Sequence, residues 1–466
     1  MVVVFVLVAL VALAVLAGLH YYVWRRLVRD TTAGPGWPRR LGTAVFVAGP
    51  VLMVAGLVAE RAGVPFLVQR VLAWPGFLWM ALAMYLLLAL LVGEVVRPLL
   101  WRVRCRYRGR GGRLDGTPGH APAADTPASA DAPARADTPP RADTPARVEI
   151  SPRAVIPPRV ETSIPPRVET SPQAAEAATG VGVAGQPVGV GGSSRRLFLG
   201  RAVGAAATVA AVGVVGNGTY GVMRGPKVKR VTVPLARLPR AAHGFRIAVV
   251  SDIHLGPVLG RGFAERVVDT INATQPDLIA VVGDLVDGSV ADLAPAVAPL
   301  ARLRARHGTY FVTGNHEYFS GADPWVAHVR EIGLRPLENA RVEMGAFDLA
   351  GVNDISGENY GEGPDYAKAL GDRDRSRAAI LLAHQPVMVH EAVRHGVDLQ
   401  LSGHTHGGQL WPGNFIADLA NPTVAGLERY GDTQLYVSRG AGAWGPPVRV
   451  GAPSDITVVE LASKQA

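Results

Sequence analysis

Five short apolar runs, each ending at a polar or charged residue, constrain the fold of residues 226–463 more than any other feature. The runs are FRIAVVSD, DLIAVVGD, GTYFVTGN, AAILLAHQ and VDLQLSGH. Runs of this length and composition are typical of strands that are buried on both faces. Helix-like segments, such as 262–274 and 290–306, lie between several of them. This alternation predicts an α/β sandwich with packed sheets inside and helices outside.

Each of these expected strands ends in side chains that can bind a metal ion. They are Asp252 and His254 after the first strand, Asp284 and Asp287 after the second, Asn315, His316 and Glu317 after the third, His384 after the fourth, and His404 and His406 after the fifth. Open α/β sheets place their sites at the carboxyl ends of strands, so we expect these side chains to converge. One histidine at a strand end is usually structural, whereas five such coincidences in order indicate a shared site.

The residue types fit one kind of metal chemistry. Carboxylates, imidazoles and amide oxygens suit Mn, Fe or Zn, and the set contains no thiolate. A carboxylate such as Asp284 can bridge two cations. Two cations held close together can hold a bridging hydroxide and clamp a phosphoryl group during in-line displacement. We therefore expect His404 and His406 to serve different metals, with Thr405 between them facing away.

The ordered motifs D-x-H, G-D-x-x-D, G-N-H-E, H and G-H-x-H resemble those of the calcineurin-like metallophosphoesterase superfamily over about residues 228–463. The segment GHTHGGQLWP and the C-terminal SRGAGAWGPPVRVGAPSDITVVEL look like its membrane-associated bacterial branch. The resemblance implies two mixed β-sheets flanked by helices. It also implies a dinuclear centre of two divalent or trivalent ions, of which Mn, Fe and Zn are the candidates.

The same resemblance implies a role for each residue of the motifs. One metal is bound by Asp252, His254 and His406, the other by Asn315, His384 and His404, and Asp284 bridges them. His316 is the catalytic histidine, which donates a proton to the leaving alkoxide or steadies charge on the phosphate. Asp287 and Glu317 orient these side chains. Arg439 and Arg449 either contact phosphate or form structural contacts, and the sequence leaves both open.

The N-terminal region is dominated by three apolar segments, 1–19, 41–59 and 71–93. Each is long enough to span a bilayer, so residues 1–105 are expected to form a membrane region with three transmembrane helices. Basic residues mark the stretches 25–40 and 97–113, which the positive-inside rule places in the cytoplasm. Basic residues follow the first apolar segment rather than precede it, which is the reverse of a signal peptide.

Two further segments connect the membrane region to residues 226–463. Residues 106–192 are rich in Pro, Ala, Thr and Gly, and this composition predicts a disordered linker. A cell-wall spacer is the rival interpretation, but the expected topology places this linker inside. Residues 193–220 begin with SSRRLFL, in which SRRLFL resembles a twin-arginine export signal, and the alternative is a fourth transmembrane helix. Either one sends the following domain out of the cytoplasm.

Charge and cysteine content narrow the class of protein. The formal net charge is +9, but the arginines crowd around apolar segments and the low-complexity stretch, so no nucleic-acid partner is expected. Cys105 is the only cysteine, which excludes an intrachain disulfide.

These observations together predict a multi-pass protein of the cell membrane with an extracytoplasmic catalytic domain. The expected reaction is hydrolysis of a phosphomonoester or phosphodiester, with a phospholipid or envelope precursor as a candidate substrate. The expected partners are the membrane, the phosphate-ester substrate and the twin-arginine export machinery. A phospholipid or envelope precursor as substrate would be lipid-linked. The alternative is a non-catalytic metal-binding envelope scaffold or sensor on the same fold.

Overall fold

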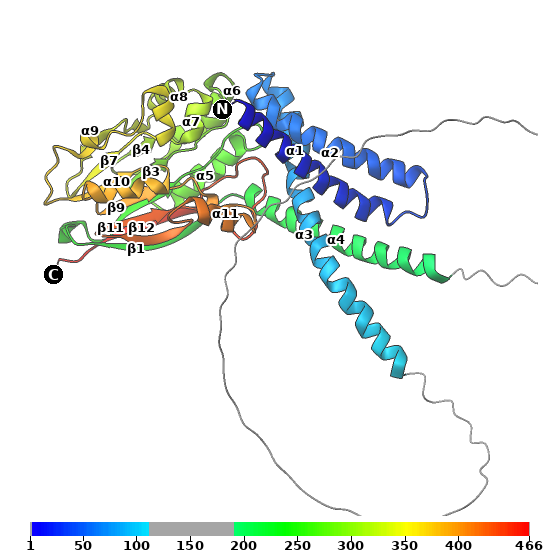
Figure 1. Cartoon of the computed structure of the whole chain (residues 1–466). Helices are drawn as coiled ribbons and strands as arrows, with labels where there is room; N and C mark the ends of the chain where they lie inside the picture. The colour runs from blue at the N-terminus through cyan, green and yellow to red at the C-terminus, as the bar shows by residue number, and fades with distance from the viewer. Residues whose placement is uncertain (1, 111–190, 466) are drawn as a thin grey trace, which may run out of the picture. The chain divides into compact units, whose positions relative to one another are not determined.

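A computed structural model describes residues 2–110 and 191–465 (Figure 1). Of these residues, 2–102 and 191–465 belong to one compact unit. The helices are α1 (Val2–Trp24), α2 (Trp37–Arg61), α3 (Phe66–Arg110), α4 (Gly191–Met223), α5 (Arg261–Ala273), α6 (Val290–Val297), α7 (Asn315–Ser320), α8 (Ala322–Glu331), α9 (Tyr366–Leu370), α10 (Val389–Arg394) and α11 (Gly413–Ala420).

The strands form two six-stranded sheets. The first has the order β1-β12-β2-β3-β4-β5, with bounds β1 (Lys227–Leu235), β12 (Asp455–Ser463), β2 (Phe245–Val250), β3 (Leu278–Val282), β4 (Thr309–Val312) and β5 (Arg335–Pro336). The second has the order β10-β11-β9-β8-β7-β6, with bounds β10 (Gly426–Tyr430), β11 (Thr433–Val437), β9 (Leu399–Ser402), β8 (Ala378–Leu382), β7 (Phe347–Gly351) and β6 (Ala340–Glu343).

Both sheets are mixed. In the first, β2, β3 and β4 run parallel, whereas β12 pairs with β2 in the antiparallel direction. In the second, β7, β8, β9 and β11 run parallel, and β6 and β10 pair antiparallel at the two edges. The parallel strands at the centre of each sheet therefore end on the same edge, where the predicted site residues follow them.

The alternation of side chains along β2 explains how the layers pack. Ile247 and Val249 point into the core between the two sheets, and Ala248 and Val250 point into the core beneath the helices of the first sheet. All four side chains are buried, as expected for a strand covered on both faces.

Helices complete the outer layers. The first sheet is covered by α5, α6 and α8, which contribute Phe263, Val297 and Trp325 to its core. The second sheet is covered by α9 and α10, which contribute Leu370 and Ala392. The expected fold, two mixed sheets flanked by helices and preceded by long apolar helices, is confirmed.

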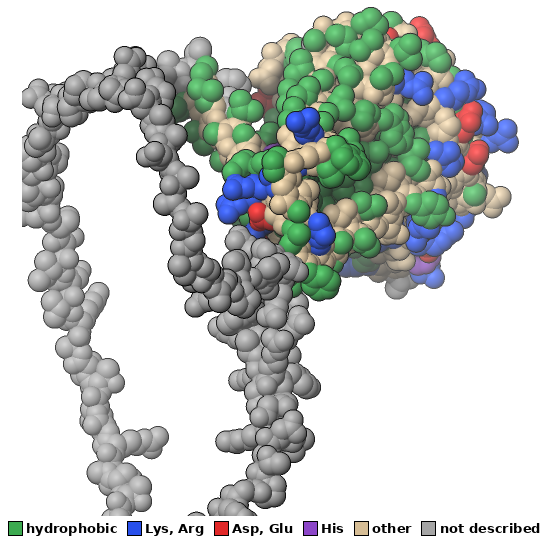
Figure 2. Space-filling model, turned by 90° about the vertical axis from the view of Figure 1, so that its right-hand side faces the viewer, with side chains coloured by type: hydrophobic (Ala, Val, Ile, Leu, Met, Phe, Trp, Pro, Cys, Tyr) green, Lys and Arg blue, Asp and Glu red, His purple; other side chains and the backbone are tan. Residues whose placement is uncertain are grey.

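Within residues 2–110 and 191–465, four helices are long and apolar enough to cross a membrane. Their apolar spans are Val6–Arg29, Trp37–Ala59, Phe66–Val96 and Leu197–Met223. The expected segments 41–59 and 71–93 fall within the second and third spans, the expected segment 1–19 overlaps the first span from Val6 onward, and the segment expected at 193–220 falls within α4. Figure 2 shows hydrophobic side chains over much of the described surface on one side of the molecule.

The structure describes only the two ends of the expected linker. Residues 106–110 are the last of α3, and residues 191 and 192 are the first of α4. The remainder of the predicted linker, 111–190, lies outside the described residues.

Candidate metal centre

The predicted ligands come together at the carboxyl ends of the parallel strands. Asp252 and His254 follow β2, Asp284 and Asp287 follow β3, and His384 follows β8. Asn315, His316 and Glu317 begin α7 directly after β4, and His404 and His406 follow β9. Three groups of these side chains place their ligand atoms within 4.8 Å of one another: Asp252, His254 and His406; Asp284, His384 and His404; and His254, Asp287 and His316.

Several residues of the site share a strained backbone conformation with positive φ. Eight non-glycine residues in the described part of the chain have positive φ, and five of them are predicted ligands: Asp252 (51°), His254 (49°), Asp284 (52°), His404 (72°) and His406 (52°). This left-handed conformation disfavours residues with a Cβ, so it persists only where the surrounding structure holds it. Its concentration at the strand ends marks them as the functional part of the fold.

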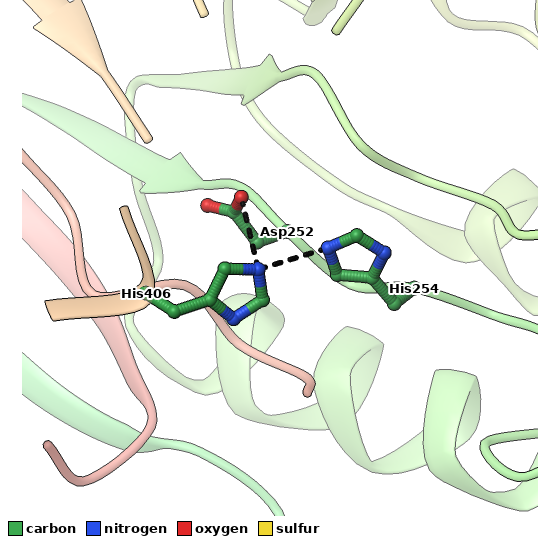
Figure 3. A group of neighbouring side chains, drawn as sticks. All are labelled: Asp252, His254 and His406. Atoms are coloured by element: carbon green, nitrogen blue, oxygen red, sulfur yellow. Dashed lines mark hydrogen bonds and ion pairs between the residues drawn. The ribbon is translucent and has the colours of Figure 1, made fainter. Parts of the chain in front are cut away.

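Asp252, His254 and His406 form the first group (Figure 3). The two Nε2 atoms of the histidines lie 3.0 Å apart, and His406 Nε2 lies 3.5 Å from Asp252 Oδ1. The Asp252 carboxylate is fixed by the backbone N–H of His404, which donates to both oxygens at 3.0 and 3.1 Å. Imidazole nitrogens and a carboxylate oxygen therefore face one buried point.

The partners on the far side of each imidazole determine which nitrogen faces that point. Asp287 Oδ1 accepts from His254 Nδ1 at 2.9 Å, which leaves the lone pair of His254 Nε2 directed into the group. Arg449 Nη2 donates to His406 Nδ1 at 3.0 Å. Burial first, then the neighbouring His254 and Arg449, hold the pKa of His406 well below its usual value. His406 is therefore neutral, and a cation bound at its Nε2 must displace the proton there.

Asp284, His384 and His404 form the second group, with Asn315 beside them. His384 Nδ1 donates to the carbonyl of Val282 at 2.9 Å, so its Nε2 carries a lone pair. That Nε2 is buried, has no hydrogen-bond partner among the described residues, and lies 3.1 Å from Asp284 Oδ2. Two acceptors face each other there, which requires a proton or a cation between them.

The pKa values of this pair follow from the contact. Burial acts to lower the pKa of His384, but the charge of Asp284 outweighs it and raises the pKa well above its usual value. Burial likewise acts to raise the pKa of Asp284, and His384, His316 and His254 together hold it well below its usual range. The carboxylate is thus ionised, which is the state a cation needs.

One oxygen connects the two groups. Asp284 Oδ2 lies 3.1 Å from His384 Nε2 in the second group and 3.7 Å from His254 Nε2 in the first. The other oxygen, Oδ1, accepts from the backbone N–H of His316 at 2.9 Å, which fixes the carboxylate. The buried His and Asp side chains therefore fit a dinuclear metal site with a shared carboxylate.

The third group has the geometry of a hydrogen-bond chain rather than of a metal site. Asp287 Oδ1 accepts from His254 Nδ1 at 2.9 Å and lies 2.7 Å from His316 Nδ1. Burial opposes charge on His316, but the hydrogen bond and charge of Asp287 outweigh it and raise the pKa of His316 to about 9. Burial also opposes charge on Asp287, whose pKa is nevertheless lowered to about 2 by His254 and His316.

Glu317 ties the site together through the backbone. Its fully buried carboxylate accepts from the backbone N–H groups of Gly314 (2.6 Å), Leu285 (2.7 Å) and Asp284 (2.9 Å). Burial, then the charge of Asp284, raises the pKa of Glu317 to about 7. These hydrogen bonds connect the start of α7 to the end of β3, and Glu317 thereby positions Asp284.

The sequence left open whether Arg449 contacts phosphate or forms structural contacts. It is buried and donates to the carbonyls of Gly442, His406 and Ala452 as well as to His406 Nδ1. Its position is structural, since each of these contacts is to the chain itself. The predicted tail motif drew attention to this arginine, but nothing in the sequence paired it with His406.

Comparison with known proteins identifies the family. Residues 245–408 match the family model described as calcineurin-like phosphoesterase. A Bos taurus protein named transmembrane protein with metallophosphoesterase domain is 40% identical over 295 residues, which cover 60% of this chain and 66% of that protein. An uncharacterized metallophosphoesterase of Helicobacter pylori strain J99 is 37% identical over 259 residues, 55% of this chain and 69% of that protein. Another, from Bacillus subtilis strain 168, is 31% identical over 288 residues, 58% of this chain and 98% of that protein.

A pair of packed sheets with a buried His/Asp centre at their strand ends defines a metal-dependent phosphoesterase. The chain belongs to the calcineurin-like metallophosphoesterase family. The aligned region covers about two thirds of the length of the bovine and H. pylori relatives. The expectation of a metal-dependent phosphoesterase is confirmed at the level of the family.

Proposed function

We propose that the chain is a membrane-tethered two-metal phosphoesterase that hydrolyses a phosphomonoester or a phosphodiester. The observation that carries this proposal is the position of Asp284 Oδ2, 3.1 Å from His384 Nε2 and 3.7 Å from His254 Nε2. A carboxylate oxygen shared by two groups of imidazoles is suited to bridging two cations. When bound, two such cations would clamp the phosphoryl group and activate water as the nucleophile.

The proposed ligands divide between two ions. Asp252, His254 and His406 would hold one, Asn315, His384 and His404 the other, and Asp284 both. The mixture of imidazole, carboxylate and amide oxygen suits Mn, Fe or Zn. Asp287 supports the first set by holding His254 in the tautomer that frees Nε2.

His316 is the proposed proton donor to the leaving alkoxide. Asp287 raises the pKa of His316 to about 9, so its imidazole is protonated at neutral pH and can give up a proton at Nε2. Its ring lies edge-on to that of His254, with centroids 4.7 Å apart. The His316 side chain is 12% exposed, so substrate can reach it from solvent, whereas five of the proposed ligands are buried: Asp252, His254, Asp284, His384 and His406.

Two sets of contacts support an extracytoplasmic catalytic domain. Arg26 pairs with Glu94 at 2.5 Å, and Arg201 donates to the carbonyl of Thr31 at 2.9 Å, so the basic ends of α1, α3 and α4 gather together. At the opposite ends, Phe66 of α3 and Met223 of α4 both pack against the core of the first sheet. The positive-inside rule puts the basic ends in the cytoplasm and the catalytic domain outside.

Export of this domain is part of the proposal. Arg195 and Arg196 lie in the first turns of α4, directly before its apolar span, which is the position a twin-arginine signal would take. The alternative, a fourth transmembrane helix with an ordinary positive flank, leads to the same topology.

The test uses the full chain in lipid nanodiscs after chelation of metal. Mn, Fe and Zn are added back separately, and release of phosphate or alcohol is measured from a panel of phosphomonoesters, phosphodiesters and phospholipids. We expect metal-dependent hydrolysis that is lost in Asp284→Ala. Full metal binding without hydrolysis of any ester would instead support the non-catalytic scaffold.

A further inference from the structure

The short helix α11 exposes an apolar surface that the catalytic domain does not cover. None of its residues is buried, and Phe415, Ile416 and Leu419 are 61%, 72% and 89% exposed. Asp418 is its only charged residue. Large apolar side chains gathered on an exposed surface are typical of a site that contacts a membrane or another protein.

The segment that leads into α11 is attached to the membrane helices. Tyr85 of α3 donates its hydroxyl proton to the carbonyl of Trp411 at 2.8 Å. Leu410 packs against a cluster formed by residues of α3 and α4, including Tyr85 and Val215. Because Tyr85 lies inside the span Phe66–Val96, the start of α11 is held beside the apolar part of α3.

The same segment reaches the metal centre through Gln409. The Gln409 side chain donates to the carbonyl of Trp444 at 2.9 Å and accepts from the Trp444 backbone N–H at 3.1 Å. The Trp444 ring lies 5.7 Å from the His316 ring, and on another side Phe319 lies 5.5 Å from it. Both aromatic side chains are exposed, so an apolar rim surrounds the proposed proton donor.

We propose that α11 lies in the bilayer that α1–α4 cross, and that the substrate is a phosphate ester carried on a lipid tail. The apolar surface is then continuous from the hydrocarbon, along α11 and Trp411, to Trp444 beside His316. A lipid can keep its tail in the bilayer while its phosphate enters the centre. This inference rests on the proposed phosphoesterase function and names its substrate class.

The position of α11 can be measured without any substrate. In a Cys105→Ser background, Ile416→Cys carries a nitroxide label, and the chain is reconstituted in phosphatidylcholine nanodiscs. Val393→Cys on α10, another exposed apolar position, is the matched control. We expect the label at 416 to be relaxed by oxygen and shielded from a water-soluble nickel complex, and the label at 393 to show the reverse. A label at 416 that is open to nickel, or that couples magnetically to a second chain, would overturn the bilayer as the partner of α11.

The substrate class is tested with matched ester pairs that differ only in their alkyl chain. Short-chain and hexadecyl phosphate form a monoester pair, and short-chain and hexadecyl p-nitrophenyl phosphate form a diester pair, with the long-chain members held in the nanodisc. We expect higher kcat/KM for the long-chain member. The triple variant Phe415→Ser, Ile416→Ser and Leu419→Ser should lose at least about tenfold of that preference, the effect of withdrawing one large apolar side chain from hydrocarbon.

The control variant Val387→Ser with Val393→Ser should retain the preference, since these two exposed valines are not part of α11. The two proposals fail in different ways. Equal kcat/KM for the short- and long-chain esters would contradict the lipid substrate and leave the phosphoesterase standing. Hydrolysis of none of the four esters by the metal-loaded wild type would count against the phosphoesterase itself, while the spin-label result would still decide where α11 lies.

Discussion

Asp287 Oδ1 lies 2.7 Å from His316 Nδ1 while it also accepts from His254 Nδ1. One carboxylate thus orients a proposed metal ligand and the proposed proton donor together. The arrangement separates two proposed functions that substitutions can test: binding of metal, which is assigned to His254, and proton transfer, which is assigned to His316.

Replacing His316 with alanine should lower turnover and leave the metals in place. General-acid assistance is typically worth about 10²–10⁴-fold, so kcat should fall by a factor in that range for alkyl esters. Aryl phosphates have good leaving groups that need little protonation, so their loss should be smaller. Steady-state kinetics on both ester classes, with metal content measured on the same samples, makes the comparison. Equal losses for alkyl and aryl esters would speak against proton donation.

The close packing of Gly314 against Asp284 predicts a second way to reduce metal binding at the centre. A Cβ at this position would overlap Asp284 Oδ1 and stand 2.5 Å from the Asp284 backbone nitrogen. Gly314→Ala should therefore displace Asp284 and reduce bound metal although no ligand has been removed. Gly345→Ala is the control, since a Cβ there would meet no atom within 4 Å. Metal analysis of both variants decides, and an undiminished metal content in Gly314→Ala would contradict the packing around Asp284.

Arg449 should be important for stability rather than for substrate binding. Arg449→Ala leaves the buried carbonyls of Gly442, His406 and Ala452 without their donor, and we expect a loss of about 2–4 kcal/mol in unfolding free energy. Thermal unfolding of the detergent-solubilised chain measures it. Arg429→Ala, at an exposed position, should change the unfolding temperature little. An equal change in unfolding temperature for Arg449→Ala and Arg429→Ala would contradict the structural role of Arg449.

The route of export is tested by a conservative exchange. Arg195→Lys with Arg196→Lys keeps the positive flank before α4 but should block a twin-arginine pathway, while a general secretion route would tolerate it. A reporter fused after residue 466 should be active outside the cell for the unmodified chain and lose that activity in the double variant. Outside activity that survives in the double variant would exclude the export signal and retain the membrane anchor. Reporter activity confined to the cytoplasm for the unmodified chain would overturn the topology.

The strand ends could be predicted from the sequence because each apolar run stops at a proposed metal ligand. Asp252, Asp284 and His404 needed only the rule that parallel strands end on one edge. The pairing of β12 between β1 and β2 was not readable, because strand pairing depends on contacts remote in sequence.

Two other features also depend on the folded structure. Arg449 and His406 are separated by 43 residues, and only the folded C-terminal loop brings them together. The exposed face of α11 could not be predicted from the sequence either, because GNFIADLA has the composition of an ordinary buried helix.

The central claim is that Asp284 bridges two metal ions, and metal stoichiometry tests it most directly. The full chain is loaded with Mn, freed of excess metal, and examined by elemental analysis and electron paramagnetic resonance. We expect two equivalents with magnetic coupling in the wild type. Asp252→Ala and His404→Ala should each lose one ion and the coupling, and Asp284→Ala should weaken both sites. Two full, coupled equivalents in Asp284→Ala would contradict the account.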